Sequence, residues 1–345
     1  MRKQDPRQGR KERDEVTQKS RKSREVSVII TNYNTRELLK GCLTSILSNQ
    51  GDVQLEVLVA DNGSTDGSAQ MVRQHFPSVY LASYAKNMGF TRAINPLLSM
   101  ATGTLCLILH PDVELLPETL QHFLAFLDTH PKAGVVGGNL YYPDGSPNPC
   151  EILFPGFRND LKCFLRKVSL HLPSFTGLPP ESNPLEWCHE KTCQVNWVWN
   201  ACMMVRREVF DKIGLFDENF FVWFADWDFC KRATDAGWAV YYLDSAKAVH
   251  HERQSFLADR EDMLELRYKV DGWYSVAGQI RDRCRFLNKH VTAASRFGTK
   301  VIAFTENTLK LCAIVARLSL GRTGRPGDIF QLKACLEVLR AILGA

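Results

Sequence analysis

The chain has 345 residues, enough for one large domain with an attachment or for two domains. Its 45% hydrophobic and 23% charged residues are typical of a globular protein with a buried core, and they exclude global disorder, collagen-like repeats and a small disulfide scaffold. The net charge of +5 arises in residues 1–25, where ten Lys and Arg residues face five acidic ones, so the remainder is neutral. Because a nucleic-acid enzyme needs a basic face on its folded part, we expect no nucleic-acid partner.

Three features predict where the protein works. Residues 1–25 contain almost no apolar side chains, which predicts a disordered tail that solubilises the protein or contacts an anionic surface. The eleven cysteines lack tandem ligand spacing, and Cys188, His189 and Cys193 have no second pair, so we expect free thiols in a reducing compartment. No apolar leader opens the sequence, and no run reaches the ~18–20 apolar residues that span a bilayer. We therefore expect a cytoplasmic protein, free or at the cytoplasmic face of the membrane.

From residue 26 onward, short apolar runs typical of buried strands alternate with helical spacing. The expected elements are strands at 26–30, 55–60, 79–82 and 104–109 and helices at 36–48, 68–75 and 90–101. Such alternation predicts an α/β fold with a mostly parallel central sheet flanked by helices, in which ligands bind at the carboxyl ends of the strands. Polar, acid-bearing loops follow three of the strands, at 31–34, 61–66 and 110–114, so we expect a binding site there.

The second half of the chain is less regular. A helix is expected at 206–213 and a strand at 239–243, and the residue pattern changes to long amphipathic helices near the C-terminus. The chain is therefore expected to divide into three parts, namely a disordered charged tail at 1–25, an α/β domain at 26–258 and a C-terminal helical extension at 259–345.

The extension is expected to contain amphipathic helices at 300–319 and 329–343. One face of the first helix is apolar and consists of Val301, Phe304, Leu311, Cys312, Val315 and Leu318. Packing against the α/β domain explains this face, and so does a homodimer interface. A helix that rests on a membrane, with Lys310 and Arg317 near the lipid headgroups, explains it as well.

Two common phosphate-binding motifs are absent. The first strand ends in Thr31, Asn32, Tyr33 and Asn34 in place of Gly-x-Gly-x-x-Gly, which argues against a dinucleotide-binding Rossmann enzyme, and the chain has no P-loop. A nucleotide can still bind through Asp61, because a carboxylate at a strand end can accept hydrogen bonds from a base or a ribose hydroxyl. The alternative for Asp61 is a turn or helix-capping role.

Two groups of acidic residues are candidates for the chemistry. Asp112 follows a buried strand with His110 two residues before it, and both can face one divalent cation that holds a diphosphate; a Pro-Asp turn is the alternative. Asp226 and Asp228 lie among aromatic residues, where lost solvation raises a carboxyl pKa and suits a general base; a salt bridge or a helix cap is the alternative. His250 lies at the end of an expected strand. It is a candidate for binding a metal or a phosphate, and an ordinary polar residue is the alternative.

Six segments carry a resemblance to a known family, namely 26–34, 59–68, 87–90, 110–112, 197–207 and 214–230. In this order they resemble the family-2 inverting glycosyltransferases with the GT-A fold, above all the rhamnosyltransferase-like branch, over about two-thirds of the chain. The resemblance implies a transferase that moves a sugar from a nucleotide-diphosphate donor to a hydroxyl of a glycan or lipid-linked acceptor, as in cell-surface polysaccharide synthesis. An inverting transfer is one in-line displacement, which needs a base on the acceptor side and charge stabilisation on the leaving-group side.

The resemblance also implies roles for individual residues. Donor-binding residues would be Thr31, Asn32, Tyr33, Asp61, Asn87, Gly89, Arg92 and Asp112. A divalent metal, Mn²⁺ or Mg²⁺, would be held by Asp112, His110 and His250. Asp226 would be the catalytic base, and the acceptor side would be formed by Trp197, Asn200 and Asp228.

Three positions depart from the family pattern. His110 replaces the first acid of the Asp-x-Asp-like motif, Ala225 replaces the Glu that usually precedes the base, and Asn200 replaces a common glycine. Imidazole is tolerated better by manganese than by magnesium. Two alternatives to the transferase stay open, namely a non-catalytic nucleotide-sugar or glycan-binding module and a nucleotidyltransferase on a similar fold.

Overall fold

The computed structural model describes residues 25–148, 154, 156–171, 191–251, 276–319, 335–336 and 338–340. Four expectations concern residues outside these ranges, namely nearly all of the charged tail, the pair Cys188 and His189, the boundary at 258 and most of the helix at 329–343. The described ranges hold the expected α/β domain and the first amphipathic helix of the extension.

Four parallel strands form one half of the sheet. They are β1 (Glu25–Asn32), β2 (Gln54–Asp61), β3 (Tyr80–Ser83) and β4 (Leu105–Leu109), connected through α2 (Arg36–Ser48), α3 (Ser68–His75) and α4 (Phe90–Met100). β1 pairs in parallel with β2 and β4, and β3 continues the sheet beyond β2. The expected alternation of strands and helices is confirmed here, because each helix supplies the long crossover that parallel neighbours need.

The other half of the sheet is mixed. It contains β5 (Val113–Leu115), β6 (Ala133–Tyr141), β7 (Cys193–Gln194), β8 (Cys202–Arg206) and β9 (Ala239–His250). The strand order is β3-β2-β1-β4-β8-β6-β9-β5, with β7 on β9. β8 runs antiparallel to β4 and β6, whereas β6 and β9 are parallel. β9 continues past the expected end at 243 and places His250 opposite Val113.

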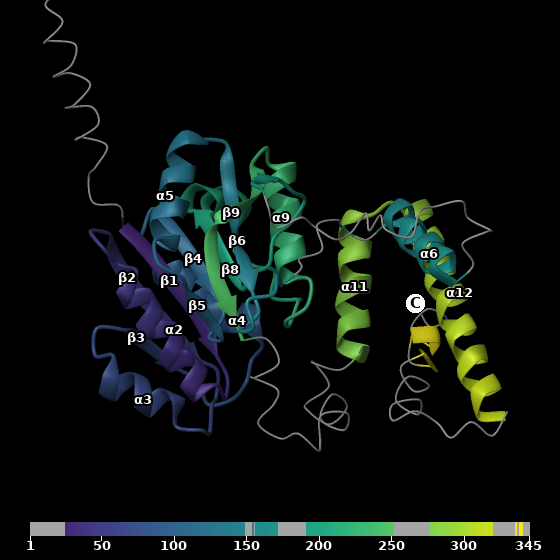
Figure 1. Cartoon of the computed structure of the whole chain (residues 1–345), viewed down its shortest axis with the longest axis horizontal. Helices are drawn as coiled ribbons and strands as arrows, with labels where there is room; N and C mark the ends of the chain where they lie inside the picture. Colours follow the sequence, from purple (N-terminus) through teal and green to yellow (C-terminus); the bar gives the residue numbers. More distant parts are fainter. Residues whose placement is uncertain are drawn as a thin grey trace, which may run out of the picture.

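Helices cover both faces of the sheet (Figure 1). Alternate residues of β1 point to opposite faces, so Val28 and Ile30 lie in one hydrophobic cluster and Ile29 in the other. The first cluster is closed by α2, α3 and α5 (Thr119–Thr129), and the second by α4, α8 (Arg207–Ile213) and α9 (Ala225–Asp235). The sheet is therefore buried on both sides, and its carboxyl-terminal edge carries the polar loops.

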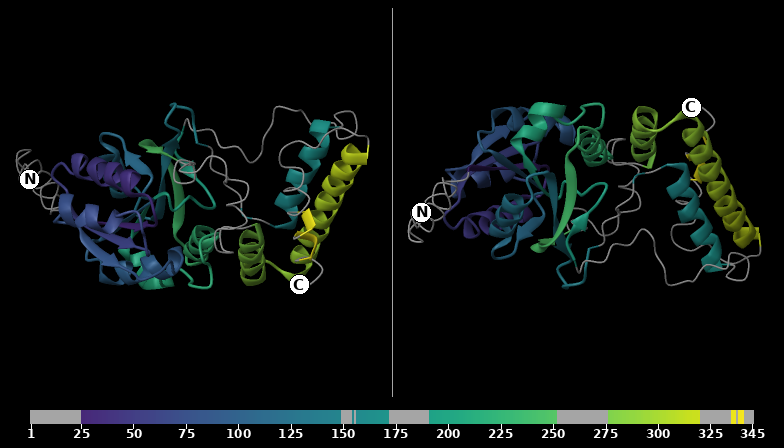
Figure 2. Two further views of the ribbon diagram at one scale, coloured as in Figure 1. Left: turned by 90° about the horizontal axis from the view of Figure 1, so that it is seen from below. Right: turned by 90° about the horizontal axis from the view of Figure 1, so that it is seen from above.

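Three further helices lie to one side of the sheet (Figures 1 and 2). They are α6 (Phe157–His171), α11 (Val276–His290) and α12 (Ala293–Ser319). The sequence pattern did not predict α6, which packs along α12 although the two are far apart in the chain. The backbone N–H of Phe157 donates to Ser295 Oγ at 3.0 Å, and Arg283 Nη2 of α11 lies 2.9 Å from Asp160 Oδ1. The C-terminal helices thus form a unit that includes a helix from the middle of the chain.

The apolar face of α12 is exposed in the described part of the chain. Val301, Phe304 and Val315 are 48%, 40% and 50% exposed, whereas the buried apolar residues among the described side chains of the helix are Ile302 and Ile314. Packing of that face against the α/β domain, which the sequence also allowed, is therefore not what the structure has. None of the described helices combines the length and the apolar character that a bilayer crossing requires.

Candidate active site

The ends of β1 and β2 place a buried amide beside a buried carboxylate. Asn32 and Asp61 are register partners in the parallel pair, and both side chains are buried. Asn32 Nδ2 donates to Asp61 Oδ1 at 3.0 Å, and the backbone N–H of Ser64 donates to Asp61 Oδ2 at 3.3 Å. Thr31 and Tyr33 flank Asn32 and are half-buried. The carboxylate of Asp61 is thus held at the sheet edge by groups that are themselves fixed by the backbone.

The next loop joins this edge to the start of α4. Asn62 Nδ2 donates to Asn87 Oδ1 at 2.9 Å, and Asn62 Oδ1 accepts from the backbone N–H of Met88 at 2.9 Å. Asn87 Oδ1 also accepts from the backbone N–H of Gly89 at 2.9 Å. Between them, Gly63 has a φ of +84°, and a Cβ there would lie 2.7 Å from the backbone of Lys86. Only glycine tolerates both the positive φ and the close approach of the Lys86 backbone. The hydrogen bonds of this loop hold the predicted residues Asn87 and Gly89 in place.

A second contact ties α4 to the loop before α9. Gly89 has a φ of +87°, and a Cβ on it would meet the Phe221 ring at 2.5 Å. The backbone N–H of Phe90 donates to Phe221 O at 2.7 Å, and Thr91 Oγ1 donates to Phe220 O at 2.6 Å. The predicted donor side and the segment that carries Asp226 are therefore directly joined.

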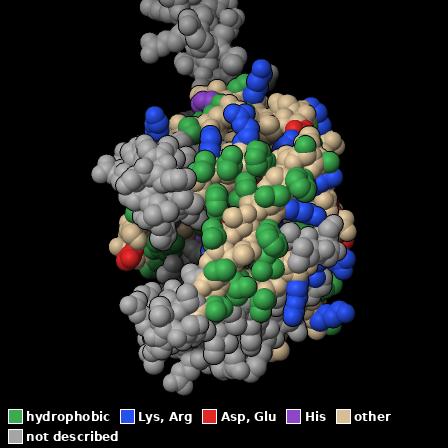
Figure 3. Space-filling view, turned by 90° about the vertical axis from the view of Figure 1, so that its right-hand side faces the viewer, with side chains coloured by type: hydrophobic (Ala, Val, Ile, Leu, Met, Phe, Trp, Pro, Cys, Tyr) green, Lys and Arg blue, Asp and Glu red, His purple; other side chains and the backbone are tan. Residues whose placement is uncertain are grey.

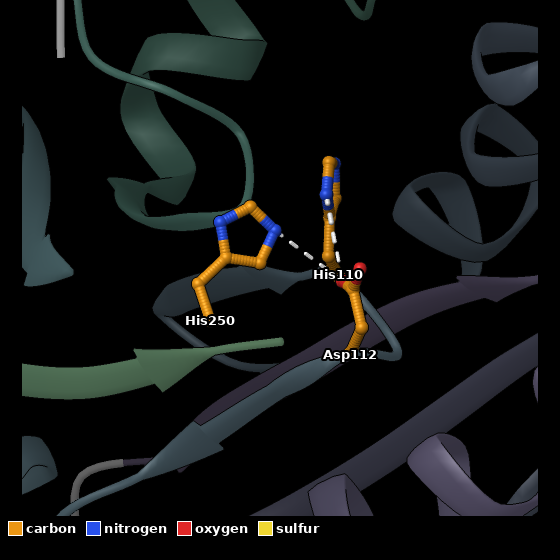
Figure 4. Close-up of side chains that lie close together, drawn as sticks. All are labelled: His110, Asp112 and His250. Carbon is orange, nitrogen blue, oxygen red and sulfur yellow. Dashed lines mark ion pairs between the residues drawn. The ribbon is translucent and has the colours of Figure 1, made fainter. Parts of the chain in front are cut away.

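His110, Asp112 and His250 converge at the ends of β4 and β9 (Figure 4). Asp112 Oδ1 lies 4.0 Å from His110 Nδ1 and 3.5 Å from His250 Nε2, and one ligand atom from each of the three residues lies within 4.8 Å of the others. Asp112 and His250 are buried, and His110 is half-buried. One carboxylate and two imidazoles are a donor set that fits a divalent metal.

Two amides orient the imidazoles from behind. His110 Nε2 is 3.0 Å from Asn200 Oδ1, and in the tautomer that donates this hydrogen bond the Nδ1 lone pair faces Asp112. His250 Nδ1 is 3.1 Å from Asn148 Nδ2. Turning the Asn148 amide over, which keeps its shape, lets His250 Nδ1 donate and leaves the Nε2 lone pair for a metal. The Asn200 amide therefore fits the metal-binding form of His110, and the Asn148 amide fits that of His250 in its turned orientation.

Asp226 lies in the first turn of α9, which begins directly after Phe224, a residue with a φ of +64°. Burial raises the pKa of Asp226 to about 7, although hydrogen bonds from the backbone N–H groups of Trp227 and Asn200 oppose this shift. The Trp227 N–H donates to Asp226 Oδ1 at 2.9 Å. A carboxylate with a pKa near neutrality is suited to take a proton from a hydroxyl group.

Asn200 connects Asp226 to the metal-ligating cluster. Its side chain reaches His110, and its backbone N–H faces the carboxylate of Asp226. The ring of Trp199, next in the chain, lies 6.2 Å from that of His250. The carboxylate of Asp226 and the His110–Asp112–His250 cluster therefore border the same region.

Other predicted residues lie apart from this region. Asp228 is fully buried on the opposite side of α9, and its oxygens lie 2.8 Å from Arg232 Nε, 2.8 Å from Lys289 Nζ and 2.7 Å from His290 Nε2. Despite burial, these bonds lower the pKa of Asp228 to about 2. Its carboxylate thus joins α9 to α11.

Trp197 and Arg92 also have structural surroundings of their own. Trp197 is buried with its ring 4.6 Å from that of Trp227, and Arg92 is exposed with Nε 3.9 Å from Glu218. Conversely, sequence reasoning did not single out Asn62 or Asn148. Asn62 stands in a recognised segment, whereas no local pattern marks Asn148.

Comparisons with known proteins agree with this geometry. The family model described as Glycosyl transferase family 2 matches residues 27–176. N-acetylglucosaminyl-diphospho-decaprenol L-rhamnosyltransferase of Mycobacterium tuberculosis is 29% identical over 259 residues, which cover 70% of this chain and 81% of that protein. Low-salt glycan biosynthesis hexosyltransferase Agl10 of Haloferax volcanii is 23% identical over 274 residues, covering 76% and 80%.

A solved structure agrees with the fold. The mannosyltransferase PcManGT from Pyrobaculum calidifontis, in complex with GDP-Man and Mn²⁺, matches with a TM-score of 0.50 at 16% identity, over 93% of this chain and 86% of that one. The fold and the sheet-edge site define the class as a GT-A glycosyltransferase. More narrowly, residues 27–176 match the model of glycosyltransferase family 2, and the chain has a rhamnosyltransferase among its relatives.

Proposed function

We propose that this protein transfers a hexose-type sugar, rhamnose included, from a nucleotide-diphosphate donor to a hydroxyl of a glycan or lipid-linked acceptor by one in-line displacement. The observation that carries the proposal is the position of Asn200, which contacts both His110 and Asp226. An inverting transfer needs charge stabilisation on the leaving-group side and a base on the acceptor side of one carbon atom. The name of the Mycobacterium tuberculosis relative, which includes a diphospho-decaprenol, supports a lipid-linked acceptor.

On the donor side, Asp61 accepts hydrogen bonds from the nucleotide base or ribose, while Asn32 and Ser64 hold its oxygens in place. The 87–89 turn forms the adjoining wall. His110, Asp112 and His250 would hold a divalent ion, which when bound neutralises charge on the departing diphosphate. The two imidazoles favour Mn²⁺ over Mg²⁺.

On the acceptor side, Asp226 takes the proton of the attacking hydroxyl. Its raised pKa makes it a stronger base than an exposed carboxylate. Asn200, behind it, keeps the base and the cluster in fixed relation, so the attacking and leaving groups can align. The free thiols among the described cysteines support a reducing, cytoplasmic location for the reaction.

Donor binding and turnover can be tested separately. Thermal shifts with a panel of nucleotide sugars, each with Mn²⁺ or Mg²⁺, identify the donor because a ligand raises apparent stability by mass action. We then expect release of the nucleoside diphosphate and attachment of the sugar to a polyprenyl-diphosphate-linked glycan. Donor binding without turnover with any acceptor would indicate a binding module, and release of pyrophosphate would indicate a nucleotidyltransferase; either result contradicts the proposal.

A further inference from the structure

One side of α12 carries a row of exposed apolar side chains, which we call the apolar stripe. Its members recur at helical spacing along one side of the helix and are Phe297, Val301, Phe304 and Val315, with exposed fractions of 70%, 48%, 40% and 50%. At 1.5 Å per residue the stripe is about 27 Å long. A row of large side chains left in water over this length costs free energy, and such patches mark interaction surfaces.

Neighbouring elements widen the stripe. On α6, Phe157 and Leu165 are 39% and 40% exposed, and Leu309 of α12 is 56% exposed. Viewed from the end of the molecule that carries α12, hydrophobic side chains gather over this face, and Lys and Arg side chains lie along its upper and right-hand edges (Figure 3). We call this surface, formed by α6 and α12, the α6–α12 face.

The charge of these helices is one-sided. The sequences of α6 and α12 together hold eight Lys and Arg residues and two acidic residues. Both acids already have cationic partners, because Asp160 Oδ1 is 2.9 Å from Arg283 Nη2 and Glu306 Oε1 is 2.9 Å from Lys310 Nζ. Arg158 and Lys162 of α6 are exposed. The two helices therefore carry an excess of positive charge in their sequences, and Arg158 and Lys162 present part of it to solvent.

We propose that the α6–α12 face binds the surface of an anionic lipid bilayer, with α12 lying along the interface. An apolar stripe flanked by cations matches both layers of such a surface, since acyl chains receive the hydrophobic side chains and lipid phosphates receive the Lys and Arg heads. A second copy of the chain is a poorer match, because two such faces would bring like charges together.

This inference goes beyond the proposed sugar transfer and does not depend on it. The membrane-bound helices would still be connected to α9, because Lys289 and His290 of α11 are bound to Asp228 of α9. The helical unit on the membrane is in this way joined to the helix that carries Asp226. A membrane-bound acceptor and the proposed base would then be held near one another.

Vesicle flotation of the full chain tests the hydrophobic part of the proposal. We expect the native protein to float with vesicles of phosphatidylglycerol and phosphatidylcholine and to stay at the bottom with phosphatidylcholine alone. The double variant Phe297→Ser/Phe304→Ser should lose about tenfold or more in partitioning. The matched control is Tyr80→Ser/Met100→Ser, since these residues are 46% and 49% exposed on the α/β domain. Equal partitioning of both variants and the native protein overturns the proposal.

A second pair of variants tests the charges and allows for the basic tail, which all of them keep. Lys162→Gln/Lys300→Gln removes two cations of the α6–α12 face, and we expect about a 25-fold loss, from about 1 kcal/mol per cation. Lys40→Gln/Lys132→Gln removes two exposed cations of the α/β domain, and we expect almost no change. Equal losses in the two pairs would assign binding to net charge or to the tail and overturn the proposal.

Two controls complete the test. The donor-induced thermal shift should be unchanged in all four variants, which shows that the α/β domain is folded. Sedimentation equilibrium in the absence of vesicles measures self-association. If the Phe297→Ser/Phe304→Ser variant dissociates an oligomer and still binds vesicles like the native protein, the face is an interface between copies, and the proposal is wrong.

Discussion

Replacing Asp226 by Asn removes the proposed base while keeping the shape of the side chain. Burial raises the pKa of Asp226 to about 7, and only the ionised form can accept a proton. A general base contributes a factor of about 10²–10⁴ to the rate, so we expect kcat to fall by that factor in Asp226→Asn. The donor contacts other groups, so the donor-induced thermal shift should stay unchanged.

The pH profile of the native protein follows from the same pKa. Below about pH 6, kcat/KM should rise nearly tenfold per pH unit, and it should level off above pH ~7.5, because protonation removes the base. Metal binding also depends on pH, because metal ligands must be deprotonated to bind. The profile is therefore measured at saturating Mn²⁺, with the Mn²⁺ affinity determined at each pH.

Stability offers an independent measurement. The folded state disfavours the ionised carboxylate, so the native protein loses stability as the pH rises from 3.8 towards about 7. This shift corresponds to at most ~4 kcal/mol, and because Asp226 is only half-buried we expect roughly 2 kcal/mol. We measure the free energy of unfolding of Asp226→Asn and of the native protein in urea. The difference between them should change in favour of the variant by roughly 2 kcal/mol between pH 4 and pH 8.

The matched control is Asp52→Asn, which makes the same change at an exposed position. It should keep native kcat and a native pH dependence of stability. A flat profile of kcat/KM between pH 5 and 8, or an equal loss of kcat in both variants, would refute the reasoning about Asp226.

Three further predictions concern the surroundings of the site. Asn148→Leu should weaken Mn²⁺ binding about 10–100-fold in titration calorimetry, since it removes the outer partner of a proposed ligand; unchanged affinity would mean that the amide does not orient the imidazole. Asp228→Asn should lower the free energy of unfolding by about 3–5 kcal/mol, because the fully buried carboxylate that binds Arg232, Lys289 and His290 loses its charge, whereas its control Asp235→Asn, in an exposed pair, should cost less than about 1 kcal/mol. Gly89→Ala should weaken donor binding at least about tenfold, because its φ of +87° and the Phe221 ring leave no room for a Cβ, and a native thermal shift with the donor would contradict this.

Local patterns were sufficient for the first half of the fold. The run at 26–30 and the spacing at 36–48 predicted β1 and α2 because a strand or a helix buries residues that are close in the chain. Acids placed directly after such strands had to lie at one edge, since parallel strands share their direction. Asp61 and Asp112 could therefore be expected near one another before any coordinates were known.

Long-range pairing determined the rest. His250 reaches Asp112 because β9 continues to pair with β5, and Asn148 reaches His250 from a segment without a readable pattern. Asp228 differs from Asp226 because two residues along a helix turn a side chain to another face, where α11 supplies its cations. Such partners lie tens to hundreds of residues away, and no local pattern encodes them.

The apolar side of α12 shows the same division. Its spacing predicted an amphipathic helix, but an apolar stripe has the same sequence whether a domain, a second chain or a membrane covers it. The fold left Phe304 and Val315 in solvent and buried Ile302 and Ile314 instead. Hydrophobicity is a property of each side chain and can be read from the sequence, whereas exposure depends on every other part of the folded chain.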